Sequence, residues 1–385
     1  MVIPSAQHLQ PTLAAWRRHL HAHPEVSYEE AETSAFLKRH VAALGLAITP
    51  VPDRHGFWVD LGPGEGPRLL LRADMDALPI AERNTHDFAS QRPGAGHLCG
   101  HDFHSAWLLG AATLLARRAG ELPRGVRLLF QHSEEEPGGA KDCIAAGALE
   151  GVDRCFALHV SPEVPLGQMA LRVGGLHAGS TKFTLTITGR GGHGARPHEC
   201  ADPILAQAAI IQGLQHIVSR RTDPLDCAVV TVGMIQGGEA YNAIPSTVTL
   251  IGTARGHSVE TVDRVSREIE EVARAIAGAH GCSVACETIF GGPPLQNDPQ
   301  AIAALTAAGR AVLGEENVLE APRRMGGEDF AFIAQERPSA FGLLGGARPD
   351  RENPPLHHPR FDPDEEALWR GAAILATVAL RGGAT

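Results

Sequence analysis

The chain has 385 residues and a formal net charge of −10 at pH 7, with 43% hydrophobic and 20% charged residues. This length exceeds one typical domain, so we expect two domains, or one large domain with an insertion. The acidic balance argues against a broad nucleic-acid surface and against a face that binds an anionic membrane, so neither partner is expected.

The cysteines and the apolar runs indicate where the protein works. The seven cysteines are odd in number and scattered, which is unlike a disulfide framework and indicates a reducing, cytoplasmic compartment. The start of the chain lacks a basic region followed by an apolar core, so we predict no signal peptide. No stretch reaches the run of about 18 apolar residues that a membrane span needs.

The first part of the chain alternates helix-like and strand-like segments. Helical spacing predicts helices over 31–44 and 101–118, and short buried strands are predicted at 68–72, 126–130 and 155–160. Strands that alternate with helices are typical of an α/β domain. We therefore predict a largely parallel, mixed sheet with helices on its faces, and loops in the glycine- and proline-rich stretches 63–67 and 345–355.

The pattern changes near residue 178. The segment predicts strands at 181–188, 228–235, 247–254 and 282–289, and helices at 201–220 and 258–279. The order β-α-β-β-α-β is that of a ferredoxin-like unit. We therefore predict an inserted domain over 178–292, with a first domain made of 1–177 and 293–385, to which a helix over 299–313 returns the chain.

Residues with useful chemistry follow the predicted strands of the first domain. Asp74 and Asp76 follow the strand at 68–72, three glutamates follow the strand at 126–130, and His159 ends the third strand. Open α/β sheets bind ligands at the carboxyl ends of their strands. We expect these side chains to converge there with the segment GHLCGHD, which precedes the helix at 101–118.

Cys99 and His101 are candidate metal ligands. They are two residues apart, so they cannot share one face of a helix, but a loop entering a helix can aim both at one ion. Thiolate and imidazole are borderline-soft ligands suited to Zn²⁺, Ni²⁺, Co²⁺ or Mn²⁺. The alternative is a buried structural cysteine beside a histidine that caps the helix.

The glutamates at 134–136 also have two interpretations. Three adjacent acids after a strand usually form a solvated turn. In an extended stretch, however, neighbours point in opposite directions, so one glutamate can bind a metal while the next acts as a base. A lone histidine such as His159 is more typical of a satisfied core residue. His193, Asn242 and Arg255, on the predicted insertion, are weak signals by themselves.

Together these segments resemble a known family. RADMDALPI, GHLCGHDFHSAWLLGAA, FQHSEEEPGGAKDCIAAGAL, ALHV, GGHGARPH, GGEDFAFI and LHHPRFD occur in the order typical of the hippurate hydrolase and auxin-conjugate amidohydrolase group. That group is a branch of the dinuclear metallopeptidases that also holds aminoacylases and carboxypeptidases. The resemblance covers nearly the whole chain and implies a catalytic α/β domain, a smaller lid domain and two divalent metal ions (Zn, Mn, Ni or Co).

The resemblance also implies roles for residues of the first domain. The implied metal ligands are Cys99, His101, Glu135, His159 and His357. Glu134 matches the general base. The three consecutive glutamates leave the assignment of base and ligand open by one residue, and the spacing after FQHS favours Glu134 as the base and Glu135 as the ligand. His357 is preferred to His358 because it follows PPL directly. We expect Asp76 to orient His101 from behind.

The resemblance implies further roles for the inserted domain. His193 resembles a lid histidine that polarises the substrate carbonyl, often from a dimer partner. Asn242 and Arg255 resemble lid residues that hold the free carboxylate, a task that suits the two-pronged guanidinium. A homodimer or homotetramer through the lid domain is therefore expected. We also expect the bulky Phe103 and Trp107 to shape the acyl pocket.

The implied reaction is hydrolysis of the amide bond of an N-acyl amino acid, such as an N-benzoyl or N-acetyl one, by a metal-bound hydroxide with a glutamate base. The alternatives within enzymes are an N-acetyl-diamino-acid deacetylase and a dipeptidase or carboxypeptidase. Outside enzymes they are a non-catalytic small-molecule binder of the same fold and a metal-stabilised structural protein. Structural zinc sites are closed by four protein ligands, so five ligands beside a base fit an open, catalytic site better.

Overall fold

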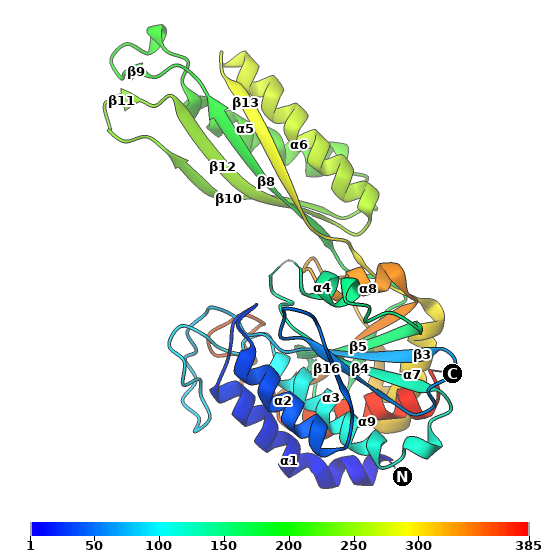
Figure 1. The fold of residues 1–385 in the computed structure, drawn as a ribbon. Helices are drawn as coiled ribbons and strands as arrows, with labels where there is room; N and C mark the ends of the chain where they lie inside the picture. Colours follow the sequence, from blue (N-terminus) through cyan, green and yellow to red (C-terminus); the bar gives the residue numbers. More distant parts are fainter. Residues whose placement is uncertain (1, 137, 384–385) are drawn as a thin grey trace. The chain divides into compact units, whose positions relative to one another are not determined.

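Two units make up the chain, and the computed structural model describes them over residues 2–136 and 138–383 (Figure 1). The first unit consists of Met1–Gly174, Gln296–Pro322 and Asp329–Thr385. The second consists of Gly175–Leu295 and the short segment Arg323–Glu328. The insertion predicted over 178–292 falls inside the second unit, but the sequence did not indicate that the short segment belongs there too.

A mixed eight-stranded sheet lies at the centre of the first unit. Its strands, in the order of the sheet, are β1 (Ile48–Pro50), β2 (Phe57–Leu61), β4 (Gly125–Gln131), β3 (Arg68–Asp74), β5 (Val152–Pro165), β16 (Ser339–Ala347), β6 (Met169–Leu171) and β15 (Val318–Glu320). The four central strands β4, β3, β5 and β16 are parallel, whereas β1 and β2 add to one edge in antiparallel fashion. The predicted α/β class with a largely parallel, mixed sheet is confirmed.

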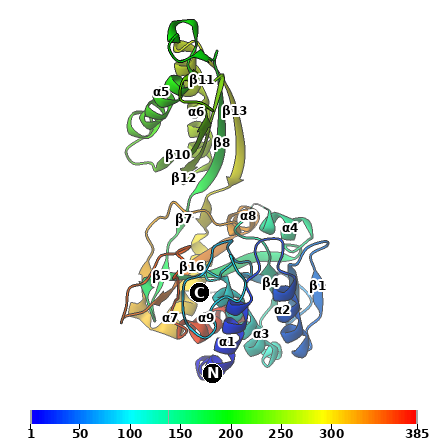
Figure 2. The same cartoon turned by 90° about the vertical axis from the view of Figure 1, so that its left-hand side faces the viewer.

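Helices cover both faces of this sheet. They are α1 (Val2–Ala22), α2 (Ala31–Ala43), α3 (His101–Ala116), α4 (Gly139–Ala145), α7 (Pro299–Leu313), α8 (Phe330–Glu336) and α9 (Ala367–Leu380). Figure 1 and Figure 2 show α4 and α8 on one side of the sheet and α1, α2, α3 and α9 on the other. No helix in the described part of the chain is both long and apolar enough to span a bilayer.

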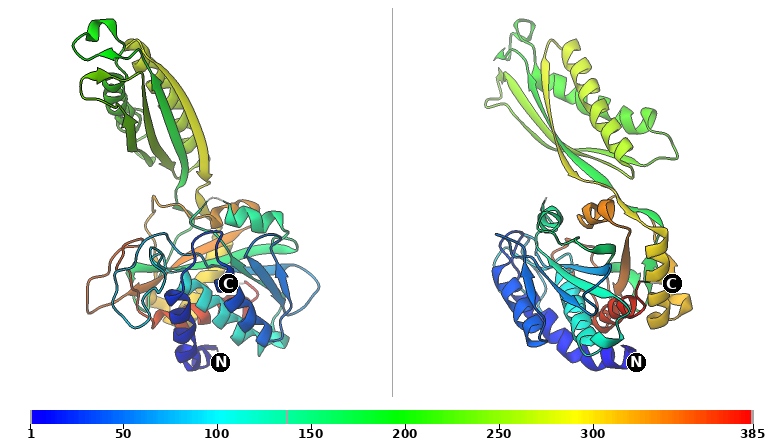
Figure 3. Two further views of the ribbon diagram at one scale, coloured as in Figure 1. Left: turned by 60° about the vertical axis from the view of Figure 1, so that its left-hand side comes forward. Right: turned by 45° about the vertical axis from the view of Figure 1, so that its right-hand side comes forward.

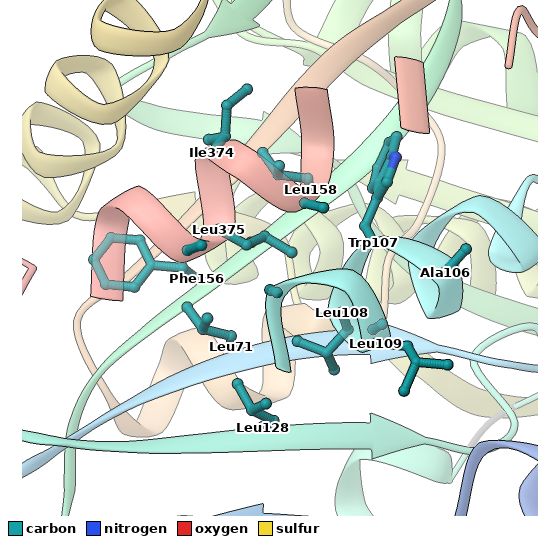
Figure 4. Close-up of a cluster of buried hydrophobic side chains, with 14 of the residues drawn as sticks. Leu71, Ala106, Trp107, Leu108, Leu109, Leu128, Phe156, Leu158, Ile374 and Leu375 are labelled. Atoms are coloured by element: carbon teal, nitrogen blue, oxygen red, sulfur yellow. The ribbon is translucent and has the colours of Figure 1, made fainter. Parts of the chain in front are cut away.

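The core explains why α3 shows almost no polar face. All but the last of its residues are buried, and Leu108 and Leu109 belong to the same buried cluster as Leu71 of β3 and Leu128 of β4 (Figure 4). A sheet strand buried on both faces reads as a continuous apolar run, which is what RLLLR and VRLLF show. This packing fixes the N-terminus of α3 beside the carboxyl ends of the strands.

The structure corrects the loop predicted at 345–355. β16 continues through Gly345 to Ala347, so the first part of that stretch is strand. A Cβ atom at Gly345 would collide with the main-chain carbonyl of Pro165 on the neighbouring β5, so glycine is required for this close approach. The glycines that indicated a loop therefore serve strand packing.

The second unit is an antiparallel sheet with helices on one face (Figure 3). Its main elements, in chain order, are β8 (Gly179–Thr188), α5 (Pro203–His216), β10 (Ala228–Gly237), β12 (Thr247–Gly256), α6 (Val259–Ala279) and β13 (Ser283–Gly292). The sheet order β10-β12-β8-β13 and the order of elements are those of a ferredoxin-like unit. A π-helical turn at Ile217–Arg221 ends α5, which was predicted as one helix to residue 220.

Four shorter strands complete the chain. They are β7 (Gly174–His177), β9 (Gly192–His193), β11 (Ala243–Ile244) and β14 (Leu295–Asn297). The pair β9 and β11 belongs to the second unit; β9 carries His193, and Asn242 directly precedes β11.

Candidate metal centre

Side chains from several elements of the first unit meet at the carboxyl ends of its central strands. In three overlapping groups, each residue offers one ligand atom, and the atoms of a group lie within 4.8 Å of one another. The groups are Cys99–His101–His159, Cys99–Glu135–His357 and His101–Glu134–Glu135. All five candidate ligands and the candidate base therefore lie together in the first unit, although His357 comes from a loop that the strand ends did not indicate.

Cys99 and His159 face each other across the start of α3. The Cys99 Sγ atom lies 3.4 Å from Nε2 of His159, and Nδ1 of the same ring lies 2.8 Å from the main-chain oxygen of Val160. Nδ1 must donate to that oxygen, so Nε2 presents its lone pair to the site. Between Cys99 and α3, Gly100 adopts φ 95°, a left-handed conformation that glycine tolerates and that turns the chain into the helix.

His101 is held from behind by Asp76. Its Nδ1 atom lies 2.9 Å from the main-chain oxygen of Asp76 and 3.1 Å from Oδ1 of the same residue, so the ring donates there. Its buried Nε2 atom has no hydrogen-bond partner among the described residues. A histidine that donates through one nitrogen and keeps the other unpaired has the geometry of a metal ligand.

Carboxylates surround that unpaired nitrogen. The Nε2 atom of His101 lies 3.7 Å from Asp74, 3.8 Å from Glu134 and 4.0 Å from Glu135. Burial disfavours a charged ring here, but the charges of Asp74 and Cys99 dominate and raise the pKa of His101 well above its ordinary value. The environment therefore favours a cation at this position.

Glu135 and His357 close the other side of the site. Oε1 of Glu135 lies 3.3 Å from Nε2 of His357, and the main-chain N–H of Glu135 donates to Oδ2 of Asp76 at 3.0 Å. His357 has φ 66°, and its N–H donates to the carbonyl of Leu98 at 2.8 Å. His358 instead accepts the N–H of Arg360 on its own Nδ1 at 3.1 Å.

The three glutamates divide between the site and the solvent. Glu134 and Glu135 keep only 10% and 14% of their side-chain surface exposed, while Glu136 is exposed. Oε1 of Glu134 accepts the main-chain N–H of Asp329 at 3.2 Å. Residues 134–136 form a bend rather than an extended stretch, so alternation does not apply here: Glu134 and Glu135 both lie at the site, and only Glu136 is exposed.

A buried ion-pair network supports the site, and the sequence interpretation missed it. Arg72 donates to Asp74 at 2.6 Å and to Asp329 at 2.7 Å, and His104 donates through Nδ1 to Asp74. Nε2 of His104 accepts the N–H of Val160 at 2.9 Å, which fixes the ring as a support. Burial opposes ionisation of Asp74, but Arg72, His101 and His104 hold the pKa of Asp74 well below its usual range.

The donor set fits divalent metal ions. It combines a thiol, imidazoles and carboxylates, which suits Zn²⁺, Ni²⁺, Co²⁺ or Mn²⁺. Burial and the charge of Glu135 raise the pKa of the Cys99 thiol, a cost that a bound cation removes by stabilising the thiolate. The overlapping groups offer more donors than one tetrahedral ion uses, so the set fits two ions.

Two further residues predicted to shape the site do not do so. Phe103 and Trp107 are fully buried. The Phe103 ring packs under the guanidinium of Arg17, and the Trp107 indole donates to the carbonyl of Ala367 at 3.1 Å. The expectation that they line an acyl pocket is wrong, because their places on α3 turn them into the helical layer.

The second unit holds the other predicted residues in two separate places. His193 and Asn242 are exposed neighbours, since His193 pairs with Ala243 and the N–H of Gly194 donates to the carbonyl of Asn242 at 2.8 Å. Arg255 lies near the other end of β12 and donates to the carbonyl of Met325 at 3.0 Å. The structure therefore does not bring Arg255 to the pair His193 and Asn242.

The proton on His193 can be placed from its surroundings. Its Nδ1 atom accepts the main-chain N–H of Ala195 at 3.1 Å. The neutral ring must therefore carry its proton on Nε2. An exposed imidazole with an outward N–H can donate a hydrogen bond to a carbonyl oxygen.

The chain matches the model of peptidase family M20/M25/M40 over residues 70–381. It is 40% identical over 376 residues to an N-acetyl-L-cysteine deacetylase of Bacillus subtilis (strain 168), covering 97% of this chain and 88% of the relative. It is also 40% identical over 374 residues to the IAA-amino acid hydrolase ILR1-like 4 of Arabidopsis thaliana, covering 95% and 84%. A putative glutamate–cysteine ligase 2-3 of Rhodococcus jostii is 38% identical, and the match spans only 46% of that protein.

A solved structure is similar over its full length. It is a dinuclear metal binding peptidase from the M20 family of Bacillus subtilis, with a TM-score of 0.85 and 34% sequence identity. The match covers 98% of this chain and 99% of that one. Both units of this chain therefore have counterparts in that structure.

Proposed function

The chain belongs to peptidase family M20/M25/M40, and from this membership we propose that it is a metal-dependent amidohydrolase that releases a carboxylic acid and a free amino acid from N-acyl amino acids. The observation that carries the proposal is the unpaired Nε2 atom of His101, which lies among three carboxylates. Relatives named as an N-acetyl-L-cysteine deacetylase and an IAA-amino acid hydrolase support the same class of reaction.

The residues of the first unit take distinct roles in this proposal. The proposed ligands are Cys99, His101, Glu135, His159 and His357. When bound there, two divalent ions would polarise the substrate carbonyl and lower the pKa of a water molecule. Glu134 takes a proton from the attacking water and passes it to the leaving amine, which is the work of a general acid–base. Asp76 keeps His101 in the tautomer that presents Nε2.

The second unit acts on the substrate as a lid. The outward Nε2–H of His193 donates to the carbonyl oxygen, where negative charge develops. Asn242 and Arg255 bind the free carboxylate, which holds the scissile bond in place. Because Arg255 is separate from the other two in the second unit, we propose that His193 and Asn242 act from a partner copy of the chain.

Association through the second unit has its own support. β10 is an edge strand of the sheet, and Met234 and Ile235 on it are 50% and 55% exposed. An edge strand with exposed apolar side chains is a site for pairing with another chain. We therefore propose a homodimer or homotetramer through the second unit. The seven cysteines are all free, which supports a reducing, cytoplasmic location.

Elemental analysis combined with a substrate panel tests the proposal. The panel holds N-benzoyl, N-acetyl and indole-acetyl amino acids, N-acetyl-diamino acids and dipeptides, each with and without chelator. We expect about two metal ions per chain and release of free amino acid that the chelator stops. No bound metal and no hydrolysis after addition of Mn²⁺, Zn²⁺, Co²⁺ or Ni²⁺ would leave a non-catalytic binder of the same fold.

A further inference from the structure

We propose that Asp329 is a positioning residue, whose buried carboxylate fixes the main-chain N–H that orients Glu134. This inference rests on the proposed role of Glu134 as the base. Asp329 follows the segment Arg323–Glu328, so it is the first residue of the first unit after the chain returns from the second. Its own peptide N–H donates to Oε1 of Glu134 at 3.2 Å.

The carboxylate of Asp329 is tied to three elements of the first unit. Its Oδ1 atom accepts Nη2 of Arg72 on β3 at 2.7 Å and Nε2 of Gln131 on β4 at 2.8 Å. Its Oδ2 atom accepts the same Gln131 nitrogen at 2.7 Å and the N–H of Ala140 on α4 at 2.8 Å. Every one of these partners is a donor, so an ionised carboxylate is matched at both oxygens.

This anchoring has a direct consequence for Glu134. The side chain of Asp329 anchors its own residue, because its carboxylate is bound to β3, β4 and α4. Because the fixed N–H occupies Oε1 of Glu134, Oε2 is the oxygen that lies 3.8 Å from Nε2 of His101. Oε1 thus accepts the orienting hydrogen bond, and Oε2 faces the candidate metal site.

Two neighbouring contacts show that the glutamate segment is held residue by residue. Ser133, at φ 52°, donates through its N–H and its hydroxyl to Glu30 at 2.8 and 3.0 Å. Glu135 donates through its N–H to Asp76 at 3.0 Å. These two contacts hold the main chain on either side of Glu134, whereas the N–H of Asp329 reaches a carboxylate oxygen of Glu134 and so acts on the base itself.

A merely structural role is the alternative, because Asp329 also offsets the charge of buried Arg72. A double-mutant cycle separates the two roles. The variants are Asp329→Asn, Glu134→Gln and the double variant, with kcat, KM and metal content measured on the best N-acyl amino acid of the panel. Residues that act through one another give non-additive effects, and independent ones give multiplicative effects.

We expect Asp329→Asn to lower kcat by about 10- to 100-fold with KM and metal content unchanged, as befits misplacement of a base. In the Glu134→Gln background, Asp329→Asn should lower kcat by less than about 3-fold. Gln131→Met, which removes one donor from the carboxylate, is a second variant if Asp329→Asn does not fold. Gln131→Met should also lower kcat, by a smaller factor than Asp329→Asn, and only in chains that keep Glu134.

Glu82→Gln is the matched control, since the side chain of Glu82 is also buried, at 3% exposure, and its partners include His21, His86, Asn84 and Ser90. Its effect, of whatever size, should be equal in both backgrounds. Equal costs of Asp329→Asn in both backgrounds, or a loss of bound metal, overturn the inference. Near-normal turnover in Glu134→Gln alone instead removes the proposed base, and with it the proposed function of that residue.

Discussion

The two units hold their candidate residues in opposite ways. In the first unit, His101 and His159 are buried, and a hydrogen bond at Nδ1 fixes each ring. In the second unit, His193 and Asn242 are exposed on or beside two-residue strands. The buried residues of the first unit are already oriented within one chain. The exposed pair His193 and Asn242 can act only on a molecule that binds to it, such as a substrate or a partner copy.

Among the changes in the first unit, removal of the proposed base should lower kcat the most. Glu134→Ala should reduce kcat on the order of 10²–10⁴-fold while the metal content stays unchanged, because acid–base work is lost and the ligands remain. Steady-state kinetics with elemental analysis measures both. Glu136→Ala is the matched control, since Glu136 is exposed and should leave kcat unchanged. Equal losses in the two variants would show that the register of the glutamates is wrong.

The two units also have separate apolar cores, which a core truncation can test. Leu250 is fully buried in the core of the second unit, so Leu250→Ala should lower the unfolding free energy of that unit by about 2–5 kcal/mol. Hydrogen exchange should show the loss in the second unit alone, with metal retained in the first. Leu225→Ala, at a side chain that is 92% exposed, should change little. Loss of metal in Leu250→Ala would mean that the units do not fold separately.

Much of the first unit could be predicted, because strand ends are readable from local sequence. The apolar runs before Asp74, before the glutamates and before His159 placed those residues at one edge. The resemblance to the amidohydrolase group is confirmed by the family match and the relatives. The contacts of Asp329 were not predictable, since its partner Arg72 is 257 residues away and no local spacing connects them. The same holds for His104, whose partners are Asp74 and the N–H of Val160.

The proposed contribution of the second unit to turnover depends on His193. His193→Ala should lower kcat on the order of 10²-fold without loss of metal, because one donor to the developing oxyanion is removed. His198→Ala is the matched control on the same exposed loop and should leave kcat unchanged. If His193 acts from a partner copy, mixing His193→Ala with Cys99→Ala chains should restore part of the activity in heterodimers. Stable heterodimers without recovery would place its action within one chain or exclude it.

The smallest expected effect concerns the buried polar groups behind the site of the first unit. Glu82 accepts His21 Nε2 at 2.9 Å, Asn84 at 2.9 Å and the N–H of Ser90 at 2.6 Å. Burial alone would raise its pKa, but the hydrogen bond and charge of His21 with the other donors lower the pKa of Glu82 to about 2. A carboxyl whose pKa is depressed on folding stabilises the fold above its ordinary pKa, and this stabilisation is lost as the pH falls.

The unfolding free energy of the metal-free protein should therefore fall between pH 4.5 and pH 3.5 by at most about 1 kcal/mol more in the wild type than in Glu82→Gln. Other carboxylates titrate equally in both proteins, so the difference isolates Glu82. Urea denaturation at the two pH values, followed by probes in each unit, measures it. Because His21 and Glu82 belong to the first unit, probes in the second should report no difference between the two proteins. Parallel pH dependences in all probes would mean that the bond between His21 and Glu82 is not ionic in solution.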